Sequence, residues 1–264
     1  MIELLSYPFM QNALAASLFT AVICGIAGTL VVVNRTVYIT GGVAHASYGG
    51  IGLALFAGFS PVLGAMGVAL IMGIILGIMK ENYSQRTDAV TSALWAAGMA
   101  LGILLSDITP GYSVDFLSYL FGNILLLSPF DVILSAVFAA LLIVVALRFY
   151  RTILITSADQ AYATTLGINV RKVNILLLVL LCVSVVVLMR VAGLILVMAL
   201  LSIPASIAET YSKQLSKMML IAGFIAAAAL LGGLALSTAA GLTPSATIVA
   251  LLALAYLGNT LIRK

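Results

Sequence analysis

Long apolar runs separated by short polar stretches make up almost the whole chain. About 20 consecutive apolar residues are enough to cross the hydrocarbon core of a bilayer as an α-helix. Runs of this kind lie at 10–33, 41–59, 61–80, 88–106, 130–150, 172–190, 193–210, 216–236 and 244–261. The pattern predicts an all-α protein, a polytopic transmembrane helical bundle of about 8–9 spans, with residues 1–264 forming a single transmembrane domain.

Three regions interrupt the alternation of span and turn. The segment 107–129 has an apolar centre, 116–127, that is too short to span, so we expect a short helix at the outer face. Glycine and proline within 192–204 predict a kinked or interrupted helix, which a membrane tolerates where protein or a cavity satisfies the freed backbone. The stretch 237–247 predicts an external polar turn, with Pro244 near the start of the last helix.

Composition supports a membrane protein and argues against several other classes. Of the 264 residues, 64% are hydrophobic and 8% are charged, whereas soluble domains carry about 25% charged residues. The basic residues lie at the ends of spans rather than in a patch, so we expect a lipid bilayer and no nucleic acid as partner. Cys24 and Cys182 both fall in apolar runs, which favours core positions over a disulfide or metal pair.

Charges at the span ends predict how the chain is oriented. If the polar stretch around residues 156–172 is cytoplasmic, eleven of the twelve basic residues lie inside and only Arg190 lies at an outer end. Four acidic residues then lie outside: Glu3, Asp107, Asp115 and Asp131. The positive-inside rule therefore predicts the N-terminus outside and the C-terminus inside, an orientation that requires an odd number of spans.

The polar, alanine-rich segment 157–168 is unusual in so apolar a chain. We interpret it as a short cytoplasmic helix at which a soluble partner docks, and the alternative is an ordinary amphipathic loop between spans. Its expected parts are an N-terminal cap, a small docking face and a C-terminal stop. These are Ser157 or Asp159 for the cap, Ala161, Ala163 and Leu166 for the face, and Gly167 for the stop.

His45 is the single histidine and lies in the glycine-rich stretch TGGVAHASYGGIG. A helix that starts just after Arg35 places this residue about 15 Å deep, near the bilayer midplane. An ionisable side chain there is a functional candidate, and an imidazole can ligate transition metals. The alternative is a neutral histidine that donates to a backbone carbonyl at a helix crossing. The neighbouring glycines favour close helix packing.

Two further charged residues have structural explanations. Asp88 opens a predicted span, where the helix dipole stabilises a carboxylate, so we expect a capping role. Arg190 is the exception to the charge rule, and it either extends to the outer interface or pairs with an external acid. No nucleophile, base and acid converge in the sequence, and no phosphate-binding loop GxxxxGK[ST] occurs. We therefore expect no enzymatic activity and no bound cofactor in this chain.

Six stretches, in this order, resemble the metal-type permeases of bacterial ABC importers, the family that carries zinc, manganese or iron. They are GGVAHASYGGIGLAL around His45, DAVTSALWAAGMALGILL from Asp88, DFLSYLFGNILLLSPFD from Asp115, DQAYATTLGI from Asp159, VAGLILVMALLSIPA from Val191 and LTPSATIV from Leu242. The resemblance implies a homodimer of permeases in the bacterial cytoplasmic (inner) membrane. It also implies a cytoplasmic ABC ATPase dimer, which holds the ATP, and an extracytoplasmic metal-binding protein. Asp159, Ala163 and Gly167 occupy the positions of the family's coupling helix, which the ATPase grips.

One position departs from the family pattern. Zinc and manganese members usually have an aspartate one helical turn before the histidine, and here that position is Gly41. The permease then passes the ion with weaker ligation, recruits Ser47 or Tyr48, or carries a metal chelate or a small organic substrate. A gradient-driven secondary transporter is a further alternative, but such proteins usually bury several ionisable groups along their path, and only His45 qualifies here.

Overall fold

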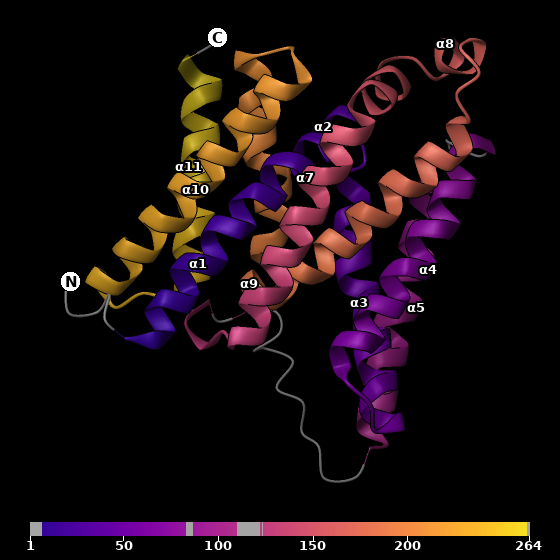
Figure 1. Ribbon diagram of the computed structural model, residues 1–264. Coiled ribbons are helices and arrows are strands. Elements are labelled where there is room, and N and C mark those ends of the chain that lie inside the picture. Colours follow the sequence, from indigo (N-terminus) through magenta and orange to yellow (C-terminus); the bar gives the residue numbers. More distant parts are fainter. Residues whose placement is uncertain (1–6, 83–86, 110–121, 123, 263–264) are drawn as a thin grey trace. The chain divides into compact units, whose positions relative to one another are not determined.

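The computed structural model describes residues 7–82, 87–109, 122 and 124–262, and every regular element in them is a helix (Figure 1). In chain order these are α1 (Pro8–Ile23), the π-helix η2 (Cys24–Gly28), α2 (Thr29–Val33), α3 (Val37–Ala57), α4 (Pro61–Asn82), α5 (Thr87–Asp107), the 3₁₀ turn η4 (Ile124–Leu126), α7 (Pro129–Ala158), α8 (Gln160–Thr165), α9 (Val170–Tyr211), α10 (Leu215–Ala240) and α11 (Pro244–Ile262). The all-α prediction is confirmed.

The span count agrees with the sequence. In the described residues, 7 helices are long and apolar enough to cross a membrane, with α1, η2 and α2 forming one of them. The 21-residue α3 is also long enough, although its glycines and its histidine make it less apolar. The 42-residue α9 contains Gly193 at φ 77° and ψ 167°, where two helices meet at a kink. With α3 and both halves of α9, the total is about nine spans.

The chain folds into two compact units, each built from separate segments. The first unit comprises Met1–Val33, Leu117–Arg148 and Val187–Lys264, and the second comprises Asn34–Phe116 and Phe149–Val186. Both α7 and α9 contribute residues to each unit. The expectation of one domain over residues 1–264 stays a prediction.

In the first unit, α10 packs against α1, η2, α2 and α11. The helices approach closely because small residues face one another at the crossings. A Cβ atom added to Gly25 would lie 2.7 Å from the carbonyl oxygen of Met219, and one added to Gly28 would lie 2.8 Å from that of Leu201. Ala205, Ala208, Met218 and Ala222 form a buried cluster in the same unit.

Both cysteines, Cys24 and Cys182, are free and buried, as predicted.

In the second unit, α3 lies along α5 and α4. A Cβ atom added to Gly49 would lie 2.8 Å from the carbonyl oxygen of Gly98, and one added to Gly52 would lie 2.6 Å from that of Gly102. These distances leave room for no side chain, because real Cβ atoms almost never come within 3.0 Å of such an atom. The interpretation of the α3 glycines as packing residues is therefore confirmed.

The three predicted interruptions have different outcomes. The kink in 192–204 is present at Gly193. The polar turn predicted at 237–247 is shorter than expected because α10 continues to Ala240, ends at Gly241 with φ 66°, and is followed by α11 from Pro244. Most of the predicted outer helix at 116–127 lies outside the described residues, and Ile124–Leu126 forms a single 3₁₀ turn.

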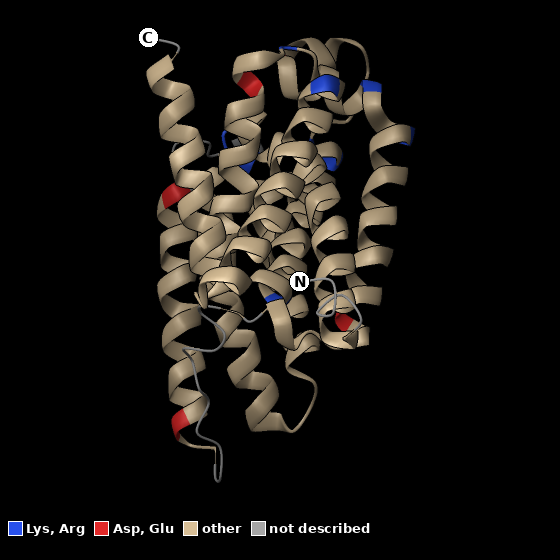
Figure 2. Cartoon of the chain, turned by 90° about the vertical axis from the view of Figure 1, so that its left-hand side faces the viewer, with Lys and Arg blue, Asp and Glu red and all other residues tan. Residues whose placement is uncertain are grey.

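Charged residues are sparse along these helices, and Figure 2 shows long stretches of helix that carry none. Arg190 and Asp131 form an ion pair within the first unit. Uncharged side chains thus cover most of the helix surface, as a lipid environment requires.

Candidate metal pathway and docking helix

His45 lies on α3, half-buried, with its ring stacked on Trp95 of α5. The ring centroids are 4.5 Å apart and the planes differ by 15°. Small residues on both sides of His45 bring the two helices close enough for this stack. Gly42, one turn earlier, abuts Thr91, and a Cβ atom added to Gly98 would lie 2.6 Å from the Cα atom of Ala46. The crossing therefore holds the imidazole face to face with the indole.

The two nitrogens of His45 differ in their surroundings. Nδ1 is buried and has no hydrogen-bond partner among the described residues, so Nε2 is the nitrogen that we consider as a ligand. A metal-ligating histidine usually donates its other ring N–H to a carboxylate, a backbone carbonyl or water, and that bond fixes the orientation of the ring. Here the stack on Trp95 provides the orientation instead.

The other groups considered for the metal pathway do not complete a site. Gly41 is buried and offers no side chain. Ser47 donates its hydroxyl to the carbonyl of Val43 at 2.8 Å, within its own helix, and Tyr48 is buried. Among the described residues, no group of three or more His, Cys, Asp or Glu residues could hold a metal ion. The α3 segment around His45 therefore offers one imidazole and no carboxylate.

Sequence reasoning missed Trp95, although a signal was present. It is the only tryptophan in the chain, and it lies in α5 among small residues. Its indole Nε1 lies 3.3 Å from Sδ of Met99, one turn further along the same helix. A lone bulky aromatic residue at a glycine-rich crossing implies a specific contact, but the sequence does not say with which helix.

The segment predicted as a docking helix is helical and has the expected ends. Asp159 has extended backbone angles, and its carboxylate accepts a hydrogen bond from the backbone N–H of Tyr162 at 3.0 Å. This is N-capping, and it selects Asp159 over Ser157 as the cap. Gly167 has φ 75°, the left-handed conformation that glycine adopts without strain at a helix end. The helix itself, Gln160–Thr165, is shorter than the predicted 157–168.

The predicted docking face needs a correction. Ala163 is fully buried, so it cannot belong to an exposed face of α8. Ala163 lies on the inner side of this short turn of helix, where its backbone carbonyl accepts a hydrogen bond from the N–H of Ile168 at 3.1 Å. The exposed side chains in this segment are those of Ala161, Tyr162, Thr164, Thr165 and Leu166, and the two large apolar ones, Tyr162 and Leu166, are 55% and 51% exposed. The sequence signal for Tyr162 was an aromatic residue within an alanine-rich polar segment.

A chain of hydrogen bonds lies next to the start of α8. The Nδ2 atom of Asn34 donates to the hydroxyl of Ser157 at 3.1 Å, and Nζ of Lys80 donates to Oδ1 of Asn34 at 3.3 Å. All three residues belong to the second unit. Ser157 thus serves as a bonding partner in the last turn of α7 rather than as the cap of α8.

Asp88 and Arg190 are placed in structural roles. Asp88 is exposed in the first turn of α5, where the helix dipole favours its charge, although Thr87 rather than Asp88 begins the helix. Arg190 donates to Oδ1 of Asp131 through Nη2 at 2.6 Å and through Nε at 3.0 Å. The other oxygen of Asp131 accepts from the hydroxyl of Ser128 at 2.7 Å. Of the two interpretations of Arg190, pairing with an acidic residue is the one observed.

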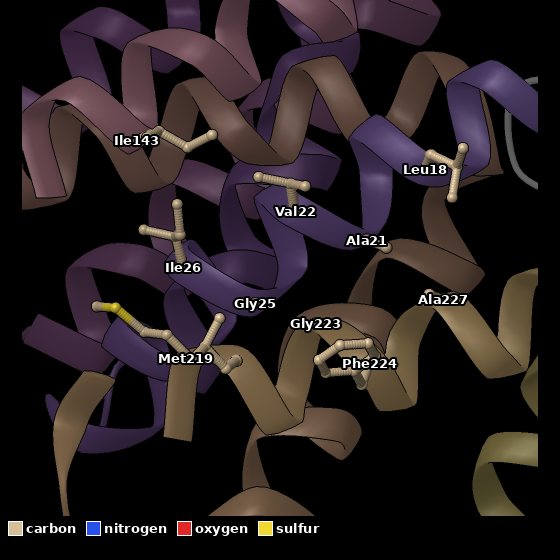
Figure 3. Close-up of a pocket in the computed structure, with 11 residues that line it drawn as sticks. Leu18, Ala21, Val22, Gly25, Ile26, Ile143, Met219, Gly223, Phe224 and Ala227 are labelled. Atoms are coloured by element: carbon tan, nitrogen blue, oxygen red, sulfur yellow. The ribbon is translucent and has the colours of Figure 1, made fainter. Parts of the chain in front are cut away.

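A cavity of about 430 Å³ lies in the first unit between α1, η2 and α10 (Figure 3). Val22 and Ile26 project from one side and Met219 and Phe224 from the other, around the close approach of Gly25. Its lining is almost entirely apolar, and an unpaired ion is strongly disfavoured in such surroundings. This cavity therefore offers no charged side chain to an ion.

The architecture and the site together define a class of protein. A bundle of apolar spanning helices with one imidazole near mid-span and a short, capped polar helix between two spans is typical of a multi-pass membrane transport protein. The family model for the ABC 3 transport family matches residues 6–263. The chain belongs to this family, which confirms the resemblance described above.

Three relatives place the chain more closely. An uncharacterized membrane protein of Synechocystis (slr2045) is 41% identical over 264 residues, which is 100% of this chain and 94% of the relative. The manganese import system permease protein ScaB of Streptococcus gordonii is 30% identical and covers 95% of this chain and 90% of its own. The solved structure of PsaBC from Streptococcus pneumoniae in complex with Fab has a TM-score of 0.86 at 28% identity, covering 98% of this chain and 93% of its own.

These relatives bear on two predictions. The family is one of transport proteins and ScaB is a permease, which confirms that the chain is a transport component and not itself an enzyme. They also confirm a multi-pass, helical membrane protein, since the likeness to the solved structure covers nearly the whole of both chains.

Proposed function

We propose that this chain is the permease subunit of an ATP-driven importer of a transition-metal ion. The cargo is zinc, manganese or iron, and the relatives that are manganese transport proteins favour manganese. Two copies of the chain form the translocation path in a bacterial cytoplasmic membrane, with the N-terminus outside and the C-terminus inside. The family match over residues 6–263 is the observation that carries this proposal.

The partners follow from the chemistry that this chain lacks. It has no phosphate-binding loop, so the energy of ATP must come from a separate cytoplasmic ATPase dimer. A binding protein outside the membrane would deliver the metal. The exposed side of α8, with Tyr162 and Leu166, is the surface that we assign to the ATPase, because large apolar side chains exposed on a short polar helix suit a protein contact.

His45 is the residue that we assign to the cargo. Its Nε2 can donate a lone pair to Mn²⁺ or Zn²⁺, both of which accept imidazole ligands. Transport requires binding that is favourable enough to admit the ion and weak enough to release it. A single imidazole without a neighbouring carboxylate at Gly41 meets that requirement better than a full ligand set would. Trp95 keeps the ring in one orientation through the stack.

Proteoliposomes that contain the permease, its ATPase and its binding protein test the proposal. We expect Mn²⁺ uptake that requires ATP hydrolysis and stops with a non-hydrolysable analogue. Vesicles that lack only the binding protein control for leakage. Uptake that continues without ATP would contradict the proposal and would favour a gradient-driven secondary transporter.

A second candidate cargo is a metal chelate or a small organic molecule. The observation in its favour is Gly41, since the carboxylate usual in zinc and manganese members is absent. Competition assays on the purified binding protein separate the two cargoes. Binding of free Mn²⁺ or Zn²⁺ supports the ion, whereas binding only of the chelated metal supports the alternative.

A further inference from the structure

Three helix ends of the second unit are joined by side chains at one point. Asn34 belongs to the turn between α2 and α3, Lys80 to the last turn of α4, and Ser157 to the last turn of α7. Asn34 uses both ends of its amide, accepting from Lys80 at 3.3 Å and donating to Ser157 at 3.1 Å. We call these three residues the amide junction. An amide that donates to one helix and accepts from another fixes both helices relative to itself.

The amide junction lies between the docking helix and the helix that carries the histidine. Ser157 comes two residues before Asp159, the cap of α8. Asn34 comes three residues before Val37, where α3 begins, and His45 lies about 12 Å further along that helix. Arg35 between them has φ 55°, a conformation that bulky residues rarely adopt, so the turn that joins Asn34 to α3 is tight. A displacement of Ser157 therefore reaches α3 through a short, stiff path.

Lys80 connects Asn34 to α4, a helix that packs tightly against α9. On the same helix, Gly73 and Gly77 lie directly against the backbone of α9, where added Cβ atoms would meet Val179 and Ile175 at 2.6 Å. Such backbone contact couples α4 firmly to that part of α9. Lys80 is one turn beyond Gly77, so its ammonium group ties Asn34 to a rigid pair of helices.

Buried polar atoms without partners accompany this junction. The hydroxyl of Thr156, next to Ser157, is buried and has no hydrogen-bond partner among the described residues. The side-chain amide nitrogen and oxygen of Asn174, next to Ile175, are also buried and have no hydrogen-bond partner among the described residues, and the residue is 1% exposed. Leaving such groups unpaired is costly, so a rearrangement that pairs them would be favourable. Thr156, next to the junction, and Asn174, on the part of α9 that contacts α4, can thus both form new hydrogen bonds when the helices shift.

From these contacts we infer that the amide junction transmits movement of α8 to α3 and so to His45. Asn34, Lys80 and Ser157 are positioning residues: they touch neither cargo nor nucleotide. The inference rests on the proposed function, in which an ATPase moves α8. It adds the path by which that movement reaches the ion pathway.

The test measures coupling in the complete transporter, reconstituted with its ATPase and binding protein and supplied with Mn²⁺. Ser157→Ala removes one end of the junction, and Lys80→Met removes the other at similar side-chain length. For each we expect the number of Mn²⁺ ions imported per ATP hydrolysed to fall about fivefold, as loss of one hydrogen bond implies. The ATPase activity stimulated by the binding protein should stay at the wild-type level, because α8 still docks.

Two further variants separate transmission from general loss of stability. Asn34→Asp keeps both contacts, since a carboxylate accepts from the Lys80 ammonium and from the Ser157 hydroxyl, and it should retain wild-type coupling. Thr260→Ala removes an exposed hydroxyl that bonds only to the carbonyl of Tyr256, and it should change nothing. The double variant of Ser157 and Lys80 should lose no more coupling than the stronger single variant, because either change breaks the same path.

The possible failures can be told apart. Wild-type coupling in Ser157→Ala and Lys80→Met would overturn the inference while leaving the proposed function intact. A parallel fall in transport and ATPase activity would also overturn it, since a structural role would then suffice. Absence of ATP-dependent uptake by the wild-type complex would overturn the proposed function, and the inference with it.

Discussion

At two helix crossings in this protein, glycine allows close packing, but the side chains beside the two crossings differ in chemistry. In the first unit, Gly25 lies against α10 near Gly223, and the space beside them is a cavity with an almost wholly apolar lining. In the second unit, Gly98 lies against Ala46 of α3, and the space beside them holds the stacked rings of His45 and Trp95. Glycine at a crossing brings helices together, but the polar atom placed there decides whether the crossing can serve transport.

The largest expected difference in effect on transport is between substitutions of two glycines that follow helices, one in each unit. Gly167 follows α8 and Gly241 follows α10, both have positive φ, and neither has an atom within 4 Å of an added Cβ. We expect Gly167→Asp to abolish ATP-dependent uptake, because it places a charge and backbone strain beside the surface assigned to the ATPase. Gly241→Asp should cost only about 1 kcal/mol of stability and leave transport intact. Uptake and thermal unfolding in detergent measure the two outcomes, and normal ATPase stimulation in Gly167→Asp would refute the docking role of α8.

The next effect concerns the imidazole itself. His45→Ala should lower Mn²⁺ uptake by at least about tenfold, since it removes the only ligand that we assign to the path. The thermal midpoint should change less than uptake does, because the side chain contributes one aromatic stack between α3 and α5 and, among the described residues, its Nδ1 makes no hydrogen bond. Equal losses of uptake and of stability would favour a histidine that serves only in packing.

A matched pair of glycines tests the packing half of the comparison. Gly98→Ala would bring a Cβ atom to 2.6 Å from the Cα atom of Ala46, so we expect a loss of about 1–3 kcal/mol in the free energy of unfolding. Gly223→Ala would place its Cβ at 3.5 Å from the nearest atom, an ordinary contact. That variant should be neutral or up to about 1 kcal/mol more stable, because alanine favours a helix. Similar losses for both variants, measured by denaturation in detergent, would contradict this distinction.

The smallest effect concerns the orientation of the imidazole. Trp95→Leu should raise the KM for Mn²⁺ delivered by the binding protein about two- to tenfold, which corresponds to the loss of one aromatic contact. Trp95→Phe should retain most of the wild-type KM because a benzene ring can still stack. An unchanged KM in Trp95→Leu would mean that the ring of His45 needs no support from α5.

The sequence predicted local features well and contacts between distant segments poorly. Hydropathy located the spans, and the residue types at 159, 167 and 193 predicted the cap, the stop and the kink, because each depends only on near neighbours in the chain. The stack of His45 on Trp95 depends on which faces of α3 and α5 meet, and nothing local specifies that. The amide junction joins three segments that are far apart in the sequence, and it was not predicted.

The error at Ala163 has the same origin. An alanine in a short polar helix is typical of an exposed face, but which side of α8 is exposed depends on how the segments before and after the helix fold around it. The π-helix at Cys24–Gly28 also went unpredicted. An inserted residue in a helix leaves no composition signal when the surrounding residues are uniformly small and apolar.

The central claim is that a cytoplasmic ATPase holds the exposed side of α8. Crosslinking from position 162 tests it most directly, since Tyr162 is exposed and both native cysteines are buried. A Tyr162→Cys permease, treated with a short bifunctional thiol reagent in the assembled complex, should form a covalent product with the ATPase and react with impermeant maleimide only from the cytoplasmic side. Labelling from the outside, or no product with the ATPase in a complex that still imports Mn²⁺, would contradict the account.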